Sequence, residues 1–118
     1  MRAVSAEAEA AMQRGVMKAA TFLKDRSQEL VPVETGALRD SWYIVRTADK
    51  AGAMVGYDRP YAVYVHEDLM KFHKFPTCAK FLEIPARVYA KDMQKIIADE
   101  IENSQRSLLS KLFRRFFS

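Results

Sequence analysis

Apolar residues recur at intervals of three and four positions through residues 3–29, and charged side chains occupy many of the positions between them. This spacing is typical of an amphipathic α-helix with one face turned to a core. Gly15 lowers the helix propensity by about 1 kcal/mol relative to alanine. Because a proline disfavours helical geometry in the residue before it, the helix is expected to end before Pro32. The apolar face comprises Val4, Ala8, Met12, Val16, Ala19, Phe22 and Leu23.

After Pro32 the pattern changes from helical spacing to alternation of apolar and polar residues. Thr35 and Gly36 predict a turn, in which the threonine can cap one helical turn over residues 37–40 and the glycine can take a positive φ. Residues 41–47 are rich in aromatic and β-branched side chains and predict a strand. A loop over 47–53 and a returning strand over 53–57 complete a β-hairpin.

Residues 60–66 fit both an alternating strand and a short helix that begins at Pro60, and we favour the helix. Residues 68–77 predict a loop, and residues 78–83 a short strand that leads into a helix over about 84–104, with Pro85 in its first turn. The last residues either extend this helix or form a separate amphipathic segment. The expected fold is α+β: an N-terminal helix, a small antiparallel sheet with a hairpin, and a long C-terminal helix. The face of that helix comprises Ile84, Val88, Tyr89, Met93, Ile96, Ile97, Ile101 and Leu108.

Charge is unevenly distributed between the body and the C-terminus. Residues 106–118 hold four of the 19 basic residues and none of the 15 acidic ones, so residues 1–105 are balanced. The length suits one domain. We assign that domain to residues 1–105 and call residues 106–118 the C-terminal arm.

The C-terminal arm combines its charge with more large apolar side chains than a solvated segment normally exposes. Three explanations are open: docking on a partner protein, packing on the body of the same chain, and binding to anionic lipid as an amphipathic helix. Nucleic acid would explain the arginines but not the apolar side chains. We rank a protein partner first. The docking residues are expected to be Leu112, Phe113, Arg114, Arg115, Phe116 and Phe117.

Candidate catalytic chemistry is sparse. His66, Glu67, Asp68 and His73 lie near Cys78, but their spacing matches no common zinc motif, and no glycine-rich phosphate loop is present. We therefore expect no enzyme activity, no metal and no other cofactor. The single cysteine permits no intrachain disulfide and fits a reducing compartment. Neither a transmembrane helix nor a secretory signal is expected.

Arg39 and a set of aromatic residues have structural interpretations. Arg39 either bridges to a carboxylate such as Glu67 or Glu83, or lies in solvent. Trp42, Tyr43, Tyr57, Tyr61 and Tyr64 could stack on nucleic-acid bases. Few basic residues accompany them, so a core or a subunit interface is favoured. That core or interface set is Trp42, Tyr57, Tyr61, Tyr64, Val65, Phe81 and Leu82.

Three motifs in this order resemble the small head–tail joining, or neck, proteins of long-tailed bacteriophages, also called tail completion, minor tail or minor capsid proteins. The first, Pro-x-x-Thr-Gly-x-Leu-Arg-x-Ser, is matched by Pro32, Thr35, Gly36, Leu38, Arg39 and Ser41. The second is matched by Val55, Gly56, Tyr61, Ala62, Tyr64 and Val65, and the third by Ala79, Phe81, Leu82, Pro85 and Ala86. The resemblance covers about residues 10–100. The chain departs from the family pattern at His66, at Asp68 and Leu69, and at Lys80.

The resemblance implies a structural virion protein that is assembled in the bacterial cytoplasm. Family members form a homo-oligomeric ring at the head–tail junction, and DNA passes through the lumen without specific contacts. The implied partners are further copies of the chain, head-closure or adaptor proteins, and tail terminator or tail tube proteins; no membrane is expected. One alternative is a tail terminator that caps the tail tube. Another is a peripheral membrane or nucleic-acid-binding module that acts through the C-terminal arm.

Overall fold

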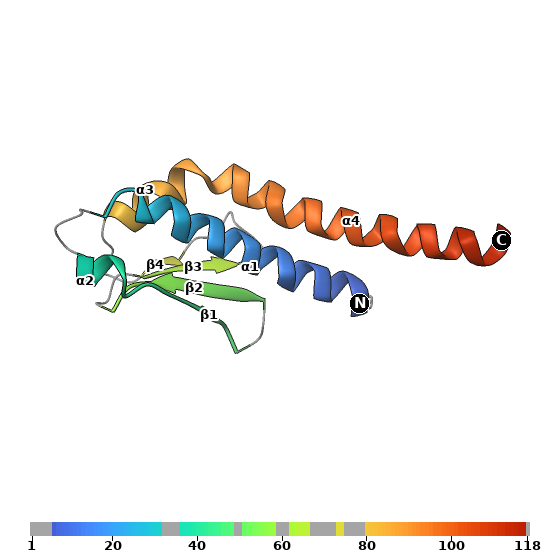
Figure 1. Cartoon of the computed structure of the whole chain (residues 1–118), viewed down its shortest axis with the longest axis horizontal. Coiled ribbons are helices and arrows are strands. Elements are labelled where there is room, and N and C mark those ends of the chain that lie inside the picture. The colour runs from blue at the N-terminus through green and yellow to red at the C-terminus, as the bar shows by residue number, and fades with distance from the viewer. Residues whose placement is uncertain are drawn as a thin grey trace.

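A computed structural model describes residues 6–31, 36–48, 51–58, 62–66, 73–74 and 80–117. The four strands form one antiparallel sheet in the order β1-β2-β3-β4 (Figure 1). This arrangement confirms the expected α+β fold, with an N-terminal helix, a small sheet that contains a hairpin, and a long C-terminal helix. The elements are α1 (Ala6–Gln28), α2 (Gly36–Arg39), β1 (Tyr43–Arg46), β2 (Gly52–Gly56), β3 (Ala62–His66), β4 (His73–Lys74), α3 (Lys80–Val88) and α4 (Ala90–Phe117).

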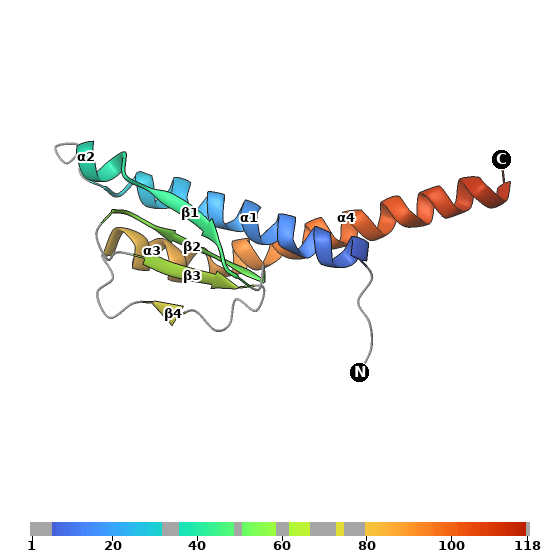
Figure 2. The same cartoon turned by 90° about the horizontal axis from the view of Figure 1, so that it is seen from below.

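Helix α1 lies between the sheet and α4, which runs antiparallel to it (Figures 1 and 2). The predicted apolar face of α1 packs against both the sheet and α4, and its residues Val16, Ala19 and Leu23 are buried in the core cluster. Gly15 lies where α1 and α4 approach closely: a Cβ built there would sit 2.9 Å from the Cα of Ile97. The glycine that weakens α1 as an isolated helix therefore permits its packing against α4.

The predicted short helix over residues 60–66 is wrong, because residues 62–66 form β3. Ala53 pairs with Val65 and Val55 with Val63, and all four side chains are buried against the helices. The alternation of residues 62–66 therefore decides the structure, and the helical spacing of the tyrosines does not. Pairing with β2 buries both Val63 and Val65. Pro60 lies outside the described residues.

The predicted strand over residues 78–83 is wrong from Lys80 onward, where α3 begins. Pro85 is the sixth residue of α3 and is buried, so it does not lie in the first turn of a later helix. It withholds one helical hydrogen bond, and α3 ends soon after it. The single helix expected over 84–104 is thus two helices, bridged by hydrogen bonds from the N–H of Tyr89 to Pro85 (2.8 Å) and of Met93 to Tyr89 (3.0 Å).

Two shorter segments also test the sequence pattern. The single helical turn proposed for residues 37–40 is present as α2, and Gly36 begins it without using the positive φ that is open to glycine. The proposed cap, Thr35, lies outside the described residues. Within the loop expected over residues 68–77, His73 and Lys74 form β4 and pair with Tyr64 and Val63.

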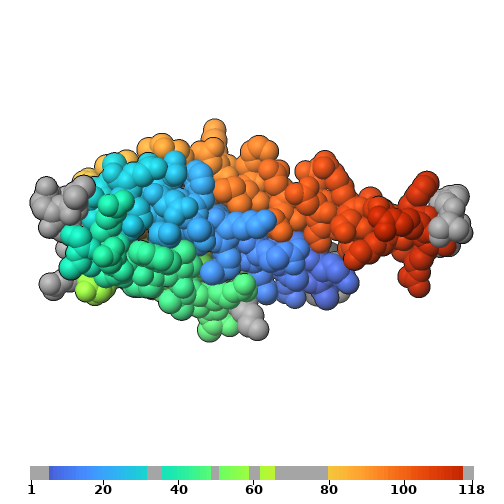
Figure 3. Space-filling model, viewed as in Figure 1, coloured from blue at the N-terminus to red at the C-terminus, as the bar shows by residue number. Residues whose placement is uncertain are grey.

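The molecule is elongated because α4 extends past the first described turn of α1 (Figures 1 and 3). Its extents are 60 × 31 × 21 Å and its radius of gyration is 16.8 Å, whereas a compact domain of this length has a radius of gyration of about 13.5 Å. Helix α4 continues to Phe117, so the terminal residues extend the helix. Within the described part of the chain, no helix is both long and apolar enough to span a bilayer.

Candidate interaction surfaces

The first motif of the resemblance holds α2 against the end of β2. The Ser41 hydroxyl donates to the Leu38 carbonyl at 2.6 Å and accepts a hydrogen bond from the Asp58 N–H at 3.1 Å. Leu38 packs against the core cluster, and Arg39 and Gly36 are exposed. The other two motif residues, Pro32 and Thr35, lie outside the described residues. The motif residues that are described therefore have a local structural role. We call the hydrogen-bonded contact that Ser41 makes with Leu38 and Asp58 the clasp.

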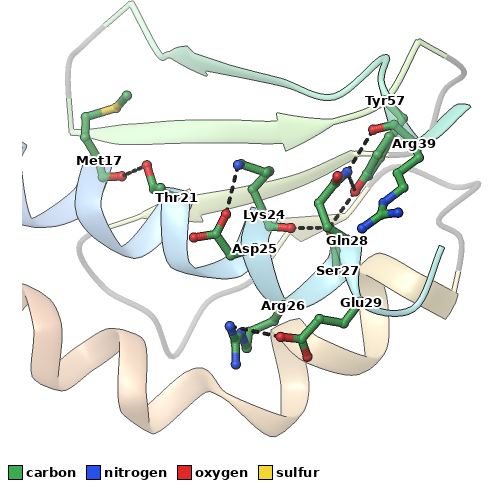
Figure 4. A network of polar contacts seen from close by, with 10 residues as sticks. All are labelled: Met17, Thr21, Lys24, Asp25, Arg26, Ser27, Gln28, Glu29, Arg39 and Tyr57. Atoms are coloured by element: carbon green, nitrogen blue, oxygen red, sulfur yellow. Dashed lines mark hydrogen bonds and ion pairs between the residues drawn. The ribbon is translucent and has the colours of Figure 1, made fainter. Parts of the chain in front are cut away.

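A buried polar network ties the end of α1 to this clasp (Figure 4). Ser27 and Tyr57 are fully buried, and their hydroxyl oxygens lie 2.7 Å apart. Because Ser27 donates its only proton to the Lys24 carbonyl at 2.8 Å, Tyr57 must donate in the bond between the hydroxyls. The side-chain amide of Gln28 donates to the Tyr57 hydroxyl and to the Arg39 carbonyl, both at 2.8 Å.

Sequence analysis did not single out Ser27 or Gln28. The only signal for Ser27 was its position four residues after Leu23, on the buried face of α1. Neither residue is arranged for catalysis, since every proton of the network is committed to a structural hydrogen bond. The network explains how a tyrosine at the end of β2 can be buried without leaving its hydroxyl unpaired.

The bridge from Arg39 to a carboxylate, one of the two alternatives for this residue, stays a prediction. One proposed partner, Glu67, lies outside the described residues. The carboxylate of the other, Glu83, accepts a hydrogen bond from Arg87 at 3.1 Å. What the structure does show is that the Arg39 main chain, through its carbonyl, is held by Gln28.

The aromatic and core set divides between the interior and the surface. Tyr57, Val65 and Leu82 are fully buried, and the Phe81 ring meets the Tyr57 ring edge to face at a centroid distance of 5.1 Å. The surface members are Tyr64, half-buried on the other face of the sheet, and Trp42, whose side chain is 42% exposed with the Lys24 ammonium 4.2 Å from its ring centroid. Tyr61 lies outside the described residues. The burial of Tyr57 removes it from any stacking platform for nucleic-acid bases.

The candidate metal ligands are mostly not described. His66 and His73 lie in β3 and β4, while Glu67, Asp68 and Cys78 lie outside the described residues. Among the residues whose placement is known, no group of three His, Cys, Asp or Glu side chains could hold a metal ion. The expectation of no cofactor stays a prediction.

The C-terminal arm is an amphipathic continuation of α4. Leu109, Leu112 and Phe113 are 65%, 45% and 64% exposed, and their spacing of three and four places them on one face. Lys111, Arg114 and Arg115 are also exposed. Packing of these apolar side chains on the body of the same chain, one of the three explanations above, is therefore wrong for residues 109–113. The side chains of Phe116 and Phe117 lie outside the described part.

Where the arm begins, α1 and α4 enclose an open, polar groove of about 340 Å³. The Glu100 carboxylate, which lines this groove, accepts hydrogen bonds from Lys18 at 2.6 Å and Arg14 at 3.1 Å. These bonds, that of Lys18 foremost, lower the pKa of the Glu100 carboxyl. The groove is thus part of the seam between two helices. Its lining residues are Glu7, Arg14, Glu100, Asn103, Ser104, Ser107, Leu108 and Lys111.

Residues 1–67 match the model of a family described as "Bacteriophage HK97-gp10, putative tail-component". The chain belongs to this family. The match spans more than half of the chain and includes α1, α2 and the strands β1 to β3. No curated protein and no solved structure matches the chain.

Membership of this phage tail-component family confirms the resemblance that the motifs indicated, although the third motif, within residues 79–86, lies beyond the matched residues. The clasp at Ser41 and the network at Tyr57 both lie within the matched residues. Helices α3 and α4 lie beyond them, and so does the C-terminal arm. The arm is therefore a feature of this chain that the family match does not describe.

Proposed function

We propose that this protein is a structural, non-enzymatic component of the phage neck, where it joins the portal or head-closure complex to the tail. The observation that carries this proposal is the family match over residues 1–67 of a chain whose terminal helix exposes an apolar face. A joining protein needs such a second surface, because it must hold one partner while its body contacts another.

Within the neck, copies of residues 1–105 form a homo-oligomeric ring. Each subunit of a ring needs two different surfaces that meet head to tail around the axis. One candidate is the outer side of α3, where Ile84 and Val88 are 45% and 64% exposed and lie one helical turn apart. Val45 on the edge strand β1 is a second exposed apolar residue on the body.

The C-terminal arm docks on a neighbouring virion protein through Leu112, Phe113, Arg115, Phe116 and Phe117. The protein is assembled in the bacterial cytoplasm and resides at the head–tail junction of the virion. DNA passes through the lumen of the ring without sequence-specific contacts. Support for a structural role comes from the Ser27–Tyr57 network, which uses its polar groups to fix the fold.

Electron microscopy of a lysate tests this function, using a phage that carries an early stop codon in this gene. We expect DNA-filled heads and finished tails side by side but unjoined, and joined particles when the intact gene is supplied from a plasmid. Overlong, irregular tails would assign the tail terminator role instead. Normal infectious particles would overturn both assignments.

A further inference from the structure

The partner of the C-terminal arm has a definable chemistry, which follows from how the arm is arranged. At about 100° per residue, the side chains of Leu108, Leu109, Leu112 and Phe113 fall within an arc of about 140°. Arg115 borders this apolar arc on one side and Arg106 on the other, while Arg114 points away from it. Leu109, Leu112 and Phe113 thus form the i, i+3, i+4 pattern by which a helix anchors in an apolar groove.

We propose that the arm binds an apolar groove on another virion protein, and that carboxylates line both rims of that groove. Arg115 then meets one rim. Arg106, which pairs with Glu102 at 3.2 Å in the free protein, meets the other rim, and Arg114 stays in solvent. Because α4 is a continuous helix up to the arm, docking needs little ordering of the chain, which favours affinity. This inference rests on the proposed function only in placing the partner in the virion.

The charge distribution argues against a second copy of this chain as the partner. Two arms placed face to face bring eight basic and no acidic residues together, and like charges disfavour such pairing. The rest of the chain has equal numbers of acidic and basic residues.

A matched set of charge reversals tests the proposal in the stop-codon phage, with full-length variants supplied from a plasmid. Arg115→Glu combined with Arg106→Glu is expected to lower the infectious titre by about a hundredfold, because a charge opposite a carboxylate rim becomes repulsive. Arg114→Glu alters charge in the same turn and is expected to leave the titre within about threefold of wild type. Circular dichroism and thermal unfolding of the purified variants check that the body remains folded.

Revertants of the Arg106→Glu, Arg115→Glu variant identify the partner. We expect suppressors that replace Asp or Glu by Lys or Arg in another virion gene. An equal loss for Arg114→Glu and for the Arg106→Glu, Arg115→Glu variant would overturn the proposal, because it indicates general attraction to an anionic surface. Binding of the purified protein to vesicles of anionic phospholipid, lost equally in those two variants, would assign that surface to a membrane. Full titre for every variant would also overturn it.

This experiment separates the arm from the proposed function. If the stop codon yields overlong tails while the charge reversals behave as expected, the neck role is overturned and the proposed partner groove is supported. If the stop codon leaves heads and tails unjoined while all arm variants restore joining, the neck role is supported and the proposed groove is overturned.

Discussion

The two halves of α4 carry similar apolar spacing but have different surroundings. In the first half, Met93 is fully buried and Ile97 nearly so, against α1. In the second half, Leu109 and Phe113 are about two-thirds exposed. The two halves differ in whether α1 lies beside them. Glu7, in the first described turn of α1, lines the same groove as Leu108 and Lys111. An apolar helical stripe therefore indicates a contact, but whether the contact is internal depends on where the next helix begins.

Matched truncations in the two halves give the largest expected contrast. Met93→Ala leaves a cavity in the core and should lower the free energy of unfolding by about 2–5 kcal/mol. Leu109→Ala removes an exposed side chain and should change it by less than about 0.5 kcal/mol. Denaturant unfolding followed by circular dichroism measures both. Equal losses would mean that the arm is packed in solution, which would remove the contrast between the two halves.

The first half of α4 also depends on the absence of a side chain at Gly15. Gly15→Ala should raise helix propensity by about 1 kcal/mol. However, its methyl group would lie 2.9 Å from the Ile97 Cα, and separating the helices should cost about 1–3 kcal/mol, so we expect no net gain in stability.

Gly36→Ala is the control, because a Cβ there meets nothing within 4 Å. We expect its stability to equal or slightly exceed that of the wild type. Thermal unfolding of both variants measures the comparison. A Gly15→Ala variant more stable than wild type would show that α1 and α4 do not approach as closely as described.

The parts of the fold that the sequence predicted are those in which local pattern and tertiary contact agree. The helix over 3–29 has one clear apolar face, and the β1–β2 hairpin has alternation and a loop of suitable length. Residues 60–66 were ambiguous, and the pairing of Val63 and Val65 with β2 decided between strand and helix. Lys80 to Glu83 resembled a strand only when read apart from the helical turns that follow.

The candidate surfaces were predictable to a smaller degree. The C-terminal arm was recognisable because its charge and apolar side chains depart from the rest of the chain. The Ser27–Tyr57 bond joins residues 30 positions apart, and no local pattern specifies such a pair. Gly15 was interpreted only as a residue that weakens a helix, because the residue that it must accommodate, Ile97, lies on α4.

The smallest expected effect concerns Glu100, which fastens the first half of α4 to α1. Arg14 and Lys18 hold its pKa below the ordinary value of 4.5. Its contribution to stability is therefore fully present above pH 4.5 and is lost as the pH falls through the lowered pKa. Glu100→Gln should lower the free energy of unfolding at pH 7 by about 1 kcal/mol or less. The difference from wild type should disappear in acid, where both side chains are neutral.

Glu102→Gln is the matched control for this change. Glu102 pairs with Arg106 at 3.2 Å within α4, and both side chains are exposed, so its loss should cost less than that of Glu100. Denaturant unfolding at pH 7 and in acid measures both variants. If Glu100→Gln still lowers the free energy of unfolding in acid, the loss of charge is not the cause. The glutamine amide would then weaken the contact between α1 and α4 by altering its packing. The two ion pairs would then hold α4 no more firmly than the exposed pairs near the arm.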